Sequence, residues 1–228
     1  MPSNNIKMNS RNSDNSAKRI AALRAFSPAT NKIQSSVSTS KTIHFIGFGT
    51  PGCKVLEYIY KQGISAKYTG IIEPGRLHLS SGIDIIPFSP PRYVRFKRGE
   101  ELIWFSDMQQ KLVVPEEIKQ LFIADHRYIL LAGLGGYTGT YMIEELSLFL
   151  NDSNKDFLAI CSLPYLFEGR ERKTNATNTF AKLRPSHHFK YLDLERLTKK
   201  YDHMSIKDAF EIADKEFYLV YKNSLGNI

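Results

Sequence analysis

Apolar residues beyond position 41 follow two alternating patterns, short nearly continuous runs and stretches with helical spacing. The runs, which are typical of strands buried on both faces, lie at Ile43–Gly47, Lys67–Ile72, Arg127–Ala132, Phe157–Ser162 and Phe189–Leu194. Helical spacing between them predicts helices at Val55–Tyr60, from Val114 onward, over residues 142–150, at Asn175–Leu183 and from Ser205 to about Tyr221. This alternation of strands and helices predicts an α/β fold with a mostly parallel sheet.

The last predicted helix has the clearest start. Ser205 and Asp208 have the spacing of a capping box, in which each side chain accepts a hydrogen bond from the other residue's backbone N–H. Between the second strand and residue 91, polar and apolar residues alternate among prolines and glycines. That stretch predicts short strands or an irregular excursion.

The composition is that of one globular domain, with 228 residues, 42% of them hydrophobic. The longest uninterrupted apolar runs, such as Tyr128–Ala132, are far shorter than the roughly 20 residues of a membrane-spanning helix. Two cysteines, Cys53 and Cys161, are too few for a disulfide scaffold or a four-cysteine metal site, and the six histidines show no ligand spacing. We therefore predict a reducing, cytoplasmic location and no metal-ligating residues.

Most of the net charge of +8 belongs to the N-terminal segment. Residues 1–41 have seven basic residues and one acid, which leaves only +2 for residues 42–228. The segment is rich in Ser, Asn, Thr and Lys, so we predict a disordered basic tail over 1–41 and a folded domain over 42–228. The nearly neutral domain argues against specific nucleic-acid binding. An organellar transit peptide, or an anchor for an acidic partner or membrane surface, is the alternative for the tail.

A first glycine turn follows the first predicted strand. Gly47–Gly52 reads G-x-G-x-x-G and opens a helix, an arrangement that lets backbone N–H groups approach a pyrophosphate. Glu73 ends the next strand, where a dinucleotide fold places an acid for a ribose hydroxyl. Taken alone, this turn predicts a nicotinamide or flavin site, and a tight turn without a ligand is the alternative.

A second glycine turn, Ala132–Thr140, follows the third predicted strand. A nicotinamide enzyme does not need it. Its glycines and the hydroxyls of Thr138 and Thr140 suit a second phosphate cradle at the start of the next helix.

Three segments in order resemble the nucleotide-binding domain of the tubulin and FtsZ family. Residues 135–141 read GGYTGTY, against the family's GGGTGTG; residues 167–172 read FEGRER, against FEGxxR; and residues 208–214 read DAFEIAD, against the DAF…AD/N run of the central helix. The resemblance implies a Rossmann-like, mostly parallel sheet with helices on both faces, and GTP or GDP as the bound cofactor. Mg²⁺ is expected to accompany a triphosphate.

The resemblance also implies roles for single residues. Phosphates would lie against a first loop and a second loop, with Arg172 nearby, while Glu168 would accept from ribose hydroxyls and Asp214 would select guanine. The first loop comprises Gly49, Thr50, Pro51, Gly52 and Cys53. The second comprises Gly135, Gly136, Thr138, Gly139 and Thr140.

Departures from the family pattern shape the expected function. Tyr137 and Tyr141 replace glycines, and only Lys97–Glu101 lies where a third phosphate loop is expected. The chain stops at Ile228, shortly after the central helix, before the family's catalytic loop and second domain. We therefore expect a truncated FtsZ-like guanine-nucleotide-binding protein, with weak or no GTPase activity alone and no catalytic residue of its own.

Such a protein would act in or on cell-division or cytoskeletal filaments through its nucleotide face, by docking on a full-length FtsZ or by self-association. Two alternatives stay open. One is a nicotinamide- or flavin-dependent oxidoreductase that uses the Gly47–Gly52 turn. The other is a non-binding pseudo-GTPase scaffold, in which Tyr137 and Tyr141 plug the site.

Overall fold

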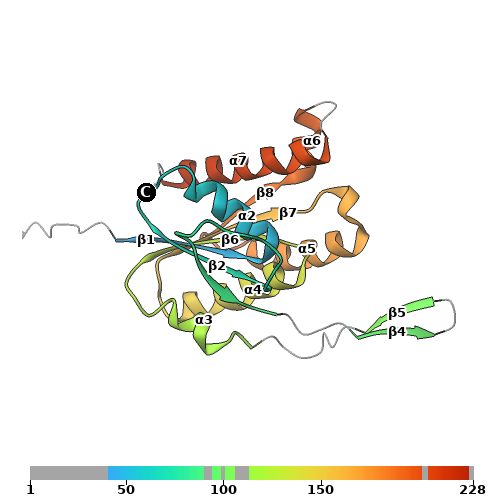
Figure 1. Cartoon of the computed structure of the whole chain (residues 1–228), viewed down its shortest axis with the longest axis horizontal. Coiled ribbons are helices and arrows are strands. Elements are labelled where there is room, and N and C mark those ends of the chain that lie inside the picture. Colours follow the sequence, from blue (N-terminus) through green and yellow to red (C-terminus); the bar gives the residue numbers. More distant parts are fainter. Residues whose placement is uncertain (1–40, 90–93, 99–100, 106–112, 202–204, 226–228) are drawn as a thin grey trace, which may run out of the picture. The chain divides into compact units, whose positions relative to one another are not determined.

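A computed structural model of the chain describes residues 41–89, 94–98, 101–105, 113–201 and 205–225 (Figure 1). The predicted basic tail lies outside these residues, except for Lys41. Within the described residues, no helix combines the length and apolar character needed to cross a membrane.

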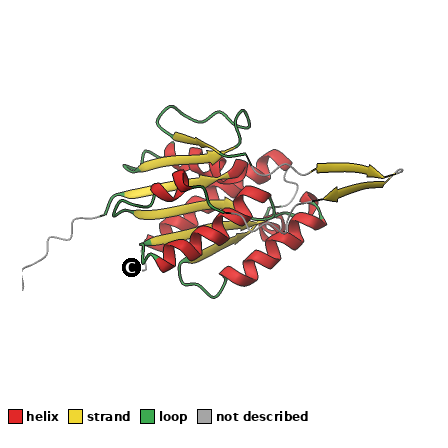
Figure 2. Ribbon diagram, turned by 90° about the horizontal axis from the view of Figure 1, so that it is seen from below, coloured by secondary structure: helices red, strands yellow, loops and turns green. Residues whose placement is uncertain are grey.

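The core of the fold is a six-stranded sheet in the order β3-β2-β1-β6-β7-β8, with every neighbouring pair parallel. Figure 2 shows its strands side by side. The strands are β1 (Ile43–Phe48), β2 (Lys67–Ile72), β3 (Asp84–Pro87), β6 (Arg127–Gly133), β7 (Phe157–Leu163) and β8 (Phe189–Asp193). The strand order reverses between β1 and β6, which makes this the topological switch point where doubly wound sheets bind ligands.

Helices cover both faces of the sheet, as expected of an α/β Rossmann-like domain (Figure 1). They are α2 (Gly49–Tyr60), α3 (Glu116–Gln120), α4 (Tyr137–Asp152), α5 (Arg170–Leu183), α6 (Leu194–Lys200) and α7 (Ile206–Leu225), together with a short 3₁₀ turn, η1 (Leu166–Glu168). Successive strand residues point to opposite faces. Phe45 therefore packs in the core beneath α2 and α7, and Ile46 in the core beneath α3, α4 and α5.

Several elements differ from the sequence prediction. Helix α2 starts at Gly49 and not at Val55, because the glycine turn itself forms the first helical turn. Similarly, α5 starts at Arg170 and not at Asn175. An antiparallel hairpin, β4 (Val94–Arg98) and β5 (Glu101–Phe105), occupies the position expected for a third phosphate loop.

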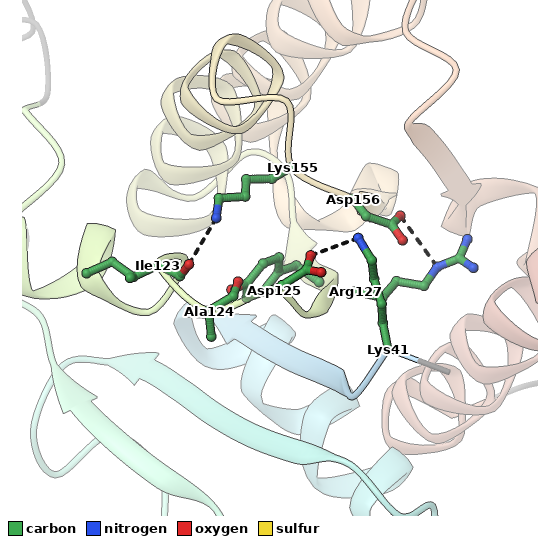
Figure 3. Close-up of polar contacts among 8 residues, drawn as sticks. Lys41, Ile123, Ala124, Asp125, Arg127, Lys155 and Asp156 are labelled. Carbon is green, nitrogen blue, oxygen red and sulfur yellow. Dashed lines mark hydrogen bonds and ion pairs between the residues drawn. The ribbon is translucent and has the colours of Figure 1, made fainter. Parts of the chain in front are cut away.

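Polar contacts tie the loops together at the amino ends of the strands (Figure 3). Lys41 Nζ lies 2.8 Å from Asp125 Oδ1, and Lys155 Nζ donates to the Ile123 carbonyl at 3.1 Å. Arg127 Nε lies 3.8 Å from Asp156 Oδ1. These contacts fix the edge of the sheet opposite to the glycine turns, which lie at the carboxyl ends.

Candidate functional site

The two glycine turns lie side by side at the switch point. Phe48 at the end of β1 pairs in register with Ala132 of β6, so the chain leaves both strands at the same edge. A Cβ atom placed on Gly49 would lie 3.5 Å from Thr138 Cβ, and one placed on Gly133 would lie 2.8 Å from Pro51 Cβ. The structure therefore brings together the two loops that the sequence had suggested as one phosphate cradle.

Close packing of the backbone explains several of the glycines without any ligand. A Cβ on Gly52 would overlap the Leu131 carbonyl oxygen, and one on Gly139 would overlap the Gly133 carbonyl oxygen. Gly136 differs, because a Cβ there would meet no atom within 4 Å. Gly136 is thus the glycine of these two turns that neither packing nor a positive φ requires.

Both helices that begin here present uncapped N-termini. Phe48 precedes α2 and Gly136 precedes α4, and neither helix start has a side-chain cap or an acid in its first turn. The first backbone N–H groups of a helix have no intrahelical acceptor, and the helix dipole makes this end positive. Two such ends side by side form a site suited to an anion.

Two of the predicted side chains turn into the protein. Thr140 is only 3% exposed, and its hydroxyl accepts a hydrogen bond from the Gly135 N–H at 2.8 Å. Cys53 is fully buried, and its thiol donates to the Gly47 carbonyl at 3.4 Å. Burial raises the pKa of the Cys53 thiol to about 12, so it is protonated at neutral pH. These groups shape the loops, whereas the half-buried Thr50 and Thr138 are the hydroxyls left at the surface.

Tyr137 and Tyr141 contact one another along the first turns of α4, with their ring planes tilted by 45°. Their ring centroids are 4.7 Å apart, and both residues are half-buried. Burial raises the pKa of each phenol above its ordinary value of 10, so both hydroxyls are neutral well beyond pH 7. Two aromatic side chains therefore lie beside the two glycine turns, at positions where the family pattern has glycines.

Glu168 and Arg172 meet next to the second glycine turn. Arg172 Nη1 donates to Glu168 Oε2 at 2.9 Å, while Glu168 Oε1 accepts the Tyr165 N–H at 3.0 Å. A Cβ on Gly135 would lie 2.7 Å from the Arg172 carbonyl oxygen, so the start of α5 abuts this turn. Both carboxylate oxygens of Glu168 already have donors, and a ribose hydroxyl would have to share one of them.

Asp214 lies on α7, which runs alongside α2 (Figure 1). It is half-buried, and this burial raises the pKa of its carboxyl to about 6, against the opposing pull of Lys54 on α2. Lys54 Nζ lies 5.7 Å from the centre of the Phe210 ring. Asp214 therefore lies where α2 and α7 meet. Lys54, the cation that acts on its carboxyl, belongs to α2, the helix that begins at the first glycine turn.

Sequence reasoning missed an aromatic group beside Asp214. Tyr165 and Phe167 stack with ring centroids 4.8 Å apart, and Phe210 lies edge-on to Tyr165 at 5.7 Å. The Tyr165 hydroxyl donates to the Ala209 carbonyl of α7 at 2.7 Å. Phe167 lies in the FEGRER segment and Phe210 in the DAFEIAD segment. Because both segments were expected to contact one nucleotide, the sequence could have indicated that these two rings lie close together.

Comparisons with known proteins agree with this geometry at the level of fold. The sequence matches no protein-family model and no curated protein. Solved structures do match. An empty FtsZ dimer from M. jannaschii has a TM-score of 0.58 at 19% identity, and a variant of that FtsZ has 0.60 at 20%. CetZ from Methanosaeta thermophila has 0.55 at 16%, and the phage tubulin PhuZ with GDP has 0.53 at 14%.

The match covers most of this chain and only part of each of the others. It includes 90% and 92% of the chain for the two FtsZ structures, 80% for CetZ and 78% for PhuZ. The corresponding shares of those proteins are 56%, 60%, 54% and 55%. The chain thus has a tubulin/FtsZ-like fold, as expected, and spans somewhat more than half the length of these proteins.

Proposed function

We propose that the chain binds a guanine nucleotide, GTP or GDP, at the switch point, and that it acts in or on FtsZ-like filaments with weak or no hydrolysis of its own. The observation that carries this proposal is the pair of uncapped helix N-termini, lying side by side where β1 and β6 end. The GDP in the similar PhuZ structure supports the choice of ligand.

The phosphates would lie against the backbone of Gly49 and Gly136, with the hydroxyls of Thr50 and Thr138 as further donors. The backbone of Arg172 abuts the second turn, and its guanidinium would add a cation there after releasing part of its bond to Glu168. Mg²⁺ would be held mainly by phosphate oxygens and water, which is its usual mode beside nucleotides. Among the described residues, no three His, Cys, Asp or Glu side chains cluster as a metal site.

The base would be selected by Asp214. Guanine presents two donors on one edge, N1–H and the 2-amino group, and an ionised carboxylate accepts both. Adenine lacks this pair of donors. The raised pKa of Asp214, about 6, still leaves the carboxylate ionised at pH 7.

An oxidoreductase receives less support from the structure. Glu73, the acid that would bind a ribose hydroxyl of a dinucleotide, is instead ion-paired with Arg76, whose Nε lies 2.8 Å from Glu73 Oε2. The scaffold alternative depends on whether the adjacent rings of Tyr137 and Tyr141 leave room for a ligand. Ligand binding decides between these functions.

Thermal unfolding with GTP, GDP, ATP and NAD provides that test. A ligand at 100 times its dissociation constant stabilises the folded state by about 2.7 kcal/mol. We expect GTP and GDP to raise the melting temperature and ATP and NAD to leave it unchanged. Stabilisation by NAD alone would favour the oxidoreductase, and no shift with any ligand would favour the scaffold.

Hydrolysis by the chain alone is expected to be slow, because none of the residues proposed for the site has the role of a base that activates water. The rate of phosphate release per chain should stay far below the typical enzyme kcat of about 10 s⁻¹. Turnover near that value would contradict the proposal.

We further propose that the nucleotide face docks on a full-length FtsZ, or on a second copy of the chain, in the cytoplasm. The dimer seen for the similar FtsZ supports such self-association, and the two free buried cysteines fit a reducing compartment. Sedimentation of a full-length FtsZ with GTP should yield less polymer, or co-pelleting, when the chain is added. Unchanged polymer without co-pelleting would reject the docking.

A further inference from the structure

The positive charge of the folded part is concentrated on one stretch. Between Arg170 and Lys190 the sequence has six basic residues and one acid, a net charge of +5. Residues 42–228 together carry only +2, so the remainder of this region is negative. The low net charge of residues 42–228 as a whole, which argued against a nucleic-acid partner, hides this uneven distribution of charge.

Much of this charge forms a single stripe along α5. At about 100° per residue, Arg170, Lys173, Thr177 and Arg184 all fall within about 60° of one another around the helix axis. All four are exposed, and the row extends for about 21 Å at 1.5 Å per residue. The acid of this stretch, Glu171, lies about 100° away from Arg170 and is therefore outside the stripe.

The cations of the stripe are available to a partner. Arg172 and Lys182, on other sides of α5, are ion-paired with Glu168 and Glu144. By contrast, within the described part of the chain neither Arg170 nor Lys173 has an acidic partner.

The surface is also hollowed at the start of the stripe. A depression of about 310 Å³ is lined by Arg170, Lys173, Thr174, Thr177 and Asn178. Its lining thus combines two cations with the Thr174 hydroxyl and the Asn178 amide, which are side chains that donate to phosphate oxygens in nucleic-acid complexes. The Thr177 hydroxyl instead donates to the Lys173 carbonyl at 2.8 Å.

We propose that this face of α5 binds the phosphate backbone of a nucleic acid. A strand presents one charge about every 3.4 Å, so an open row of cations meets several phosphates without a deep pocket. A membrane surface fits less well, because amphipathic helices that bind lipid need exposed apolar side chains. None of the exposed large hydrophobic residues of the described chain lies on α5.

An acidic protein segment also fits less well than a nucleic acid. Protein interfaces are anchored by buried aromatic or other apolar groups. Phe180, the aromatic residue of α5, is partly buried in the core, and the Arg184 guanidinium lies 6.0 Å from its ring centre. The stripe therefore offers charge and hydrogen-bond donors without an apolar anchor.

The test uses the full chain and a fluorescent single strand or duplex of about 20 nucleotides, followed by anisotropy over a salt series. The double variant Arg170→Ala with Lys173→Ala removes two stripe cations. The matched control, Lys199→Ala with Lys215→Ala, removes two exposed helical lysines that also lack an acidic partner in the described chain. Both variants keep residues 1–41, so any binding by that segment is common to them.

We expect the stripe variant to bind about tenfold more weakly near 0.1 M salt, with a log–log salt slope smaller by about 1.5. The control should stay within about twofold of the unchanged chain. Equal binding by the two variants, or no binding by the unchanged chain, would overturn the proposal. Stripe-dependent binding to phosphatidylserine vesicles without nucleic-acid binding would overturn it in favour of a membrane.

This inference is independent of the guanine-nucleotide proposal, because none of the altered residues lines the glycine turns. The thermal shift with GTP should be the same in the stripe variant and in the unchanged chain. If the unchanged chain shows a GTP shift and binds no nucleic acid, the stripe proposal alone fails. If it binds nucleic acid through the stripe and shows no GTP shift, the nucleotide proposal alone fails.

Discussion

Gly52→Ala is expected to lower the free energy of unfolding by about 3 kcal/mol or more, or to prevent folding. The new Cβ would overlap the Leu131 carbonyl oxygen and lie 3.0 Å from the Leu131 carbonyl carbon, both in the backbone of β6. Backbone atoms in the middle of a parallel sheet cannot move aside as a flexible side chain does. Equilibrium denaturation with urea measures the effect.

Gly136→Ala in the same site is the matched control. Gly136 has φ −85° and ψ 164°, an extended conformation open to any residue, and the added methyl group meets no atom within 4 Å. Stability should therefore change by less than about 1 kcal/mol. If phosphates approach this backbone, the methyl group will weaken GTP binding while the fold stays intact. A stable Gly52→Ala variant would contradict the packing argument, and an unaltered GTP affinity in Gly136→Ala would contradict the placement of the phosphates.

The strands were the most predictable part of the fold. A parallel strand is buried on both faces and must be apolar along its length, so its bounds are visible in the sequence. The second strand was predicted at Lys67–Ile72 and lies there. The last helix was predictable for another reason, since its cap is local. The Ser205 hydroxyl donates to Asp208 Oδ2 at 2.6 Å and accepts the Asp208 N–H at 3.2 Å.

Elements that depend on tertiary contacts were harder to find. The first turns of α2 and α5 contain glycine, proline or charged residues, which carry no helical apolar pattern. Their starts are fixed by the elements before them, since α2 follows directly on β1 and α5 follows the η1 turn. The short α6 was missed as well, although Asp193 caps it by accepting the Glu195 N–H at 3.2 Å. A seven-residue helix has too few turns to show a periodicity.

For the site, the sequence predicted which backbone segments meet and not how the side chains point. That the two glycine turns lie at one edge follows from topology, because the carboxyl ends of all strands in a parallel sheet share that edge. Thr140 accepts the Gly135 N–H and Glu168 pairs with Arg172, and both contacts join residues only five or four positions apart whose side-chain directions depend on local packing. The cationic stripe was missed because net charge was averaged over the whole domain.

Asp214→Ala is expected to abolish the preference for GTP over ATP, which we place at about 100-fold in the unchanged chain because two charge-assisted hydrogen bonds are involved. Competition binding with the two nucleotides measures it. Glu211→Ala is the control, since Glu211 is an exposed acid one turn earlier on α7 that raises the pKa of Asp214 without replacing its role. Equal affinities for GTP and ATP in the unchanged chain, or a preference that survives in Asp214→Ala, would reject the role of Asp214.

The pH dependence of the same residue separates binding from stability. Only the ionised carboxylate accepts both guanine donors, so GTP affinity should fall by about tenfold per pH unit below the folded pKa of about 6.

The stability of the free chain should change with pH in the opposite direction. The folded pKa lies above the ordinary value of 3.8, so the folded state binds the proton more tightly, and the contribution of this group to stability rises as the pH falls from 6 to 4. For the same reason Asp214→Asn should stabilise the free chain at pH 7 while weakening GTP binding. A variant that loses both stability and binding would instead assign Asp214 a structural role.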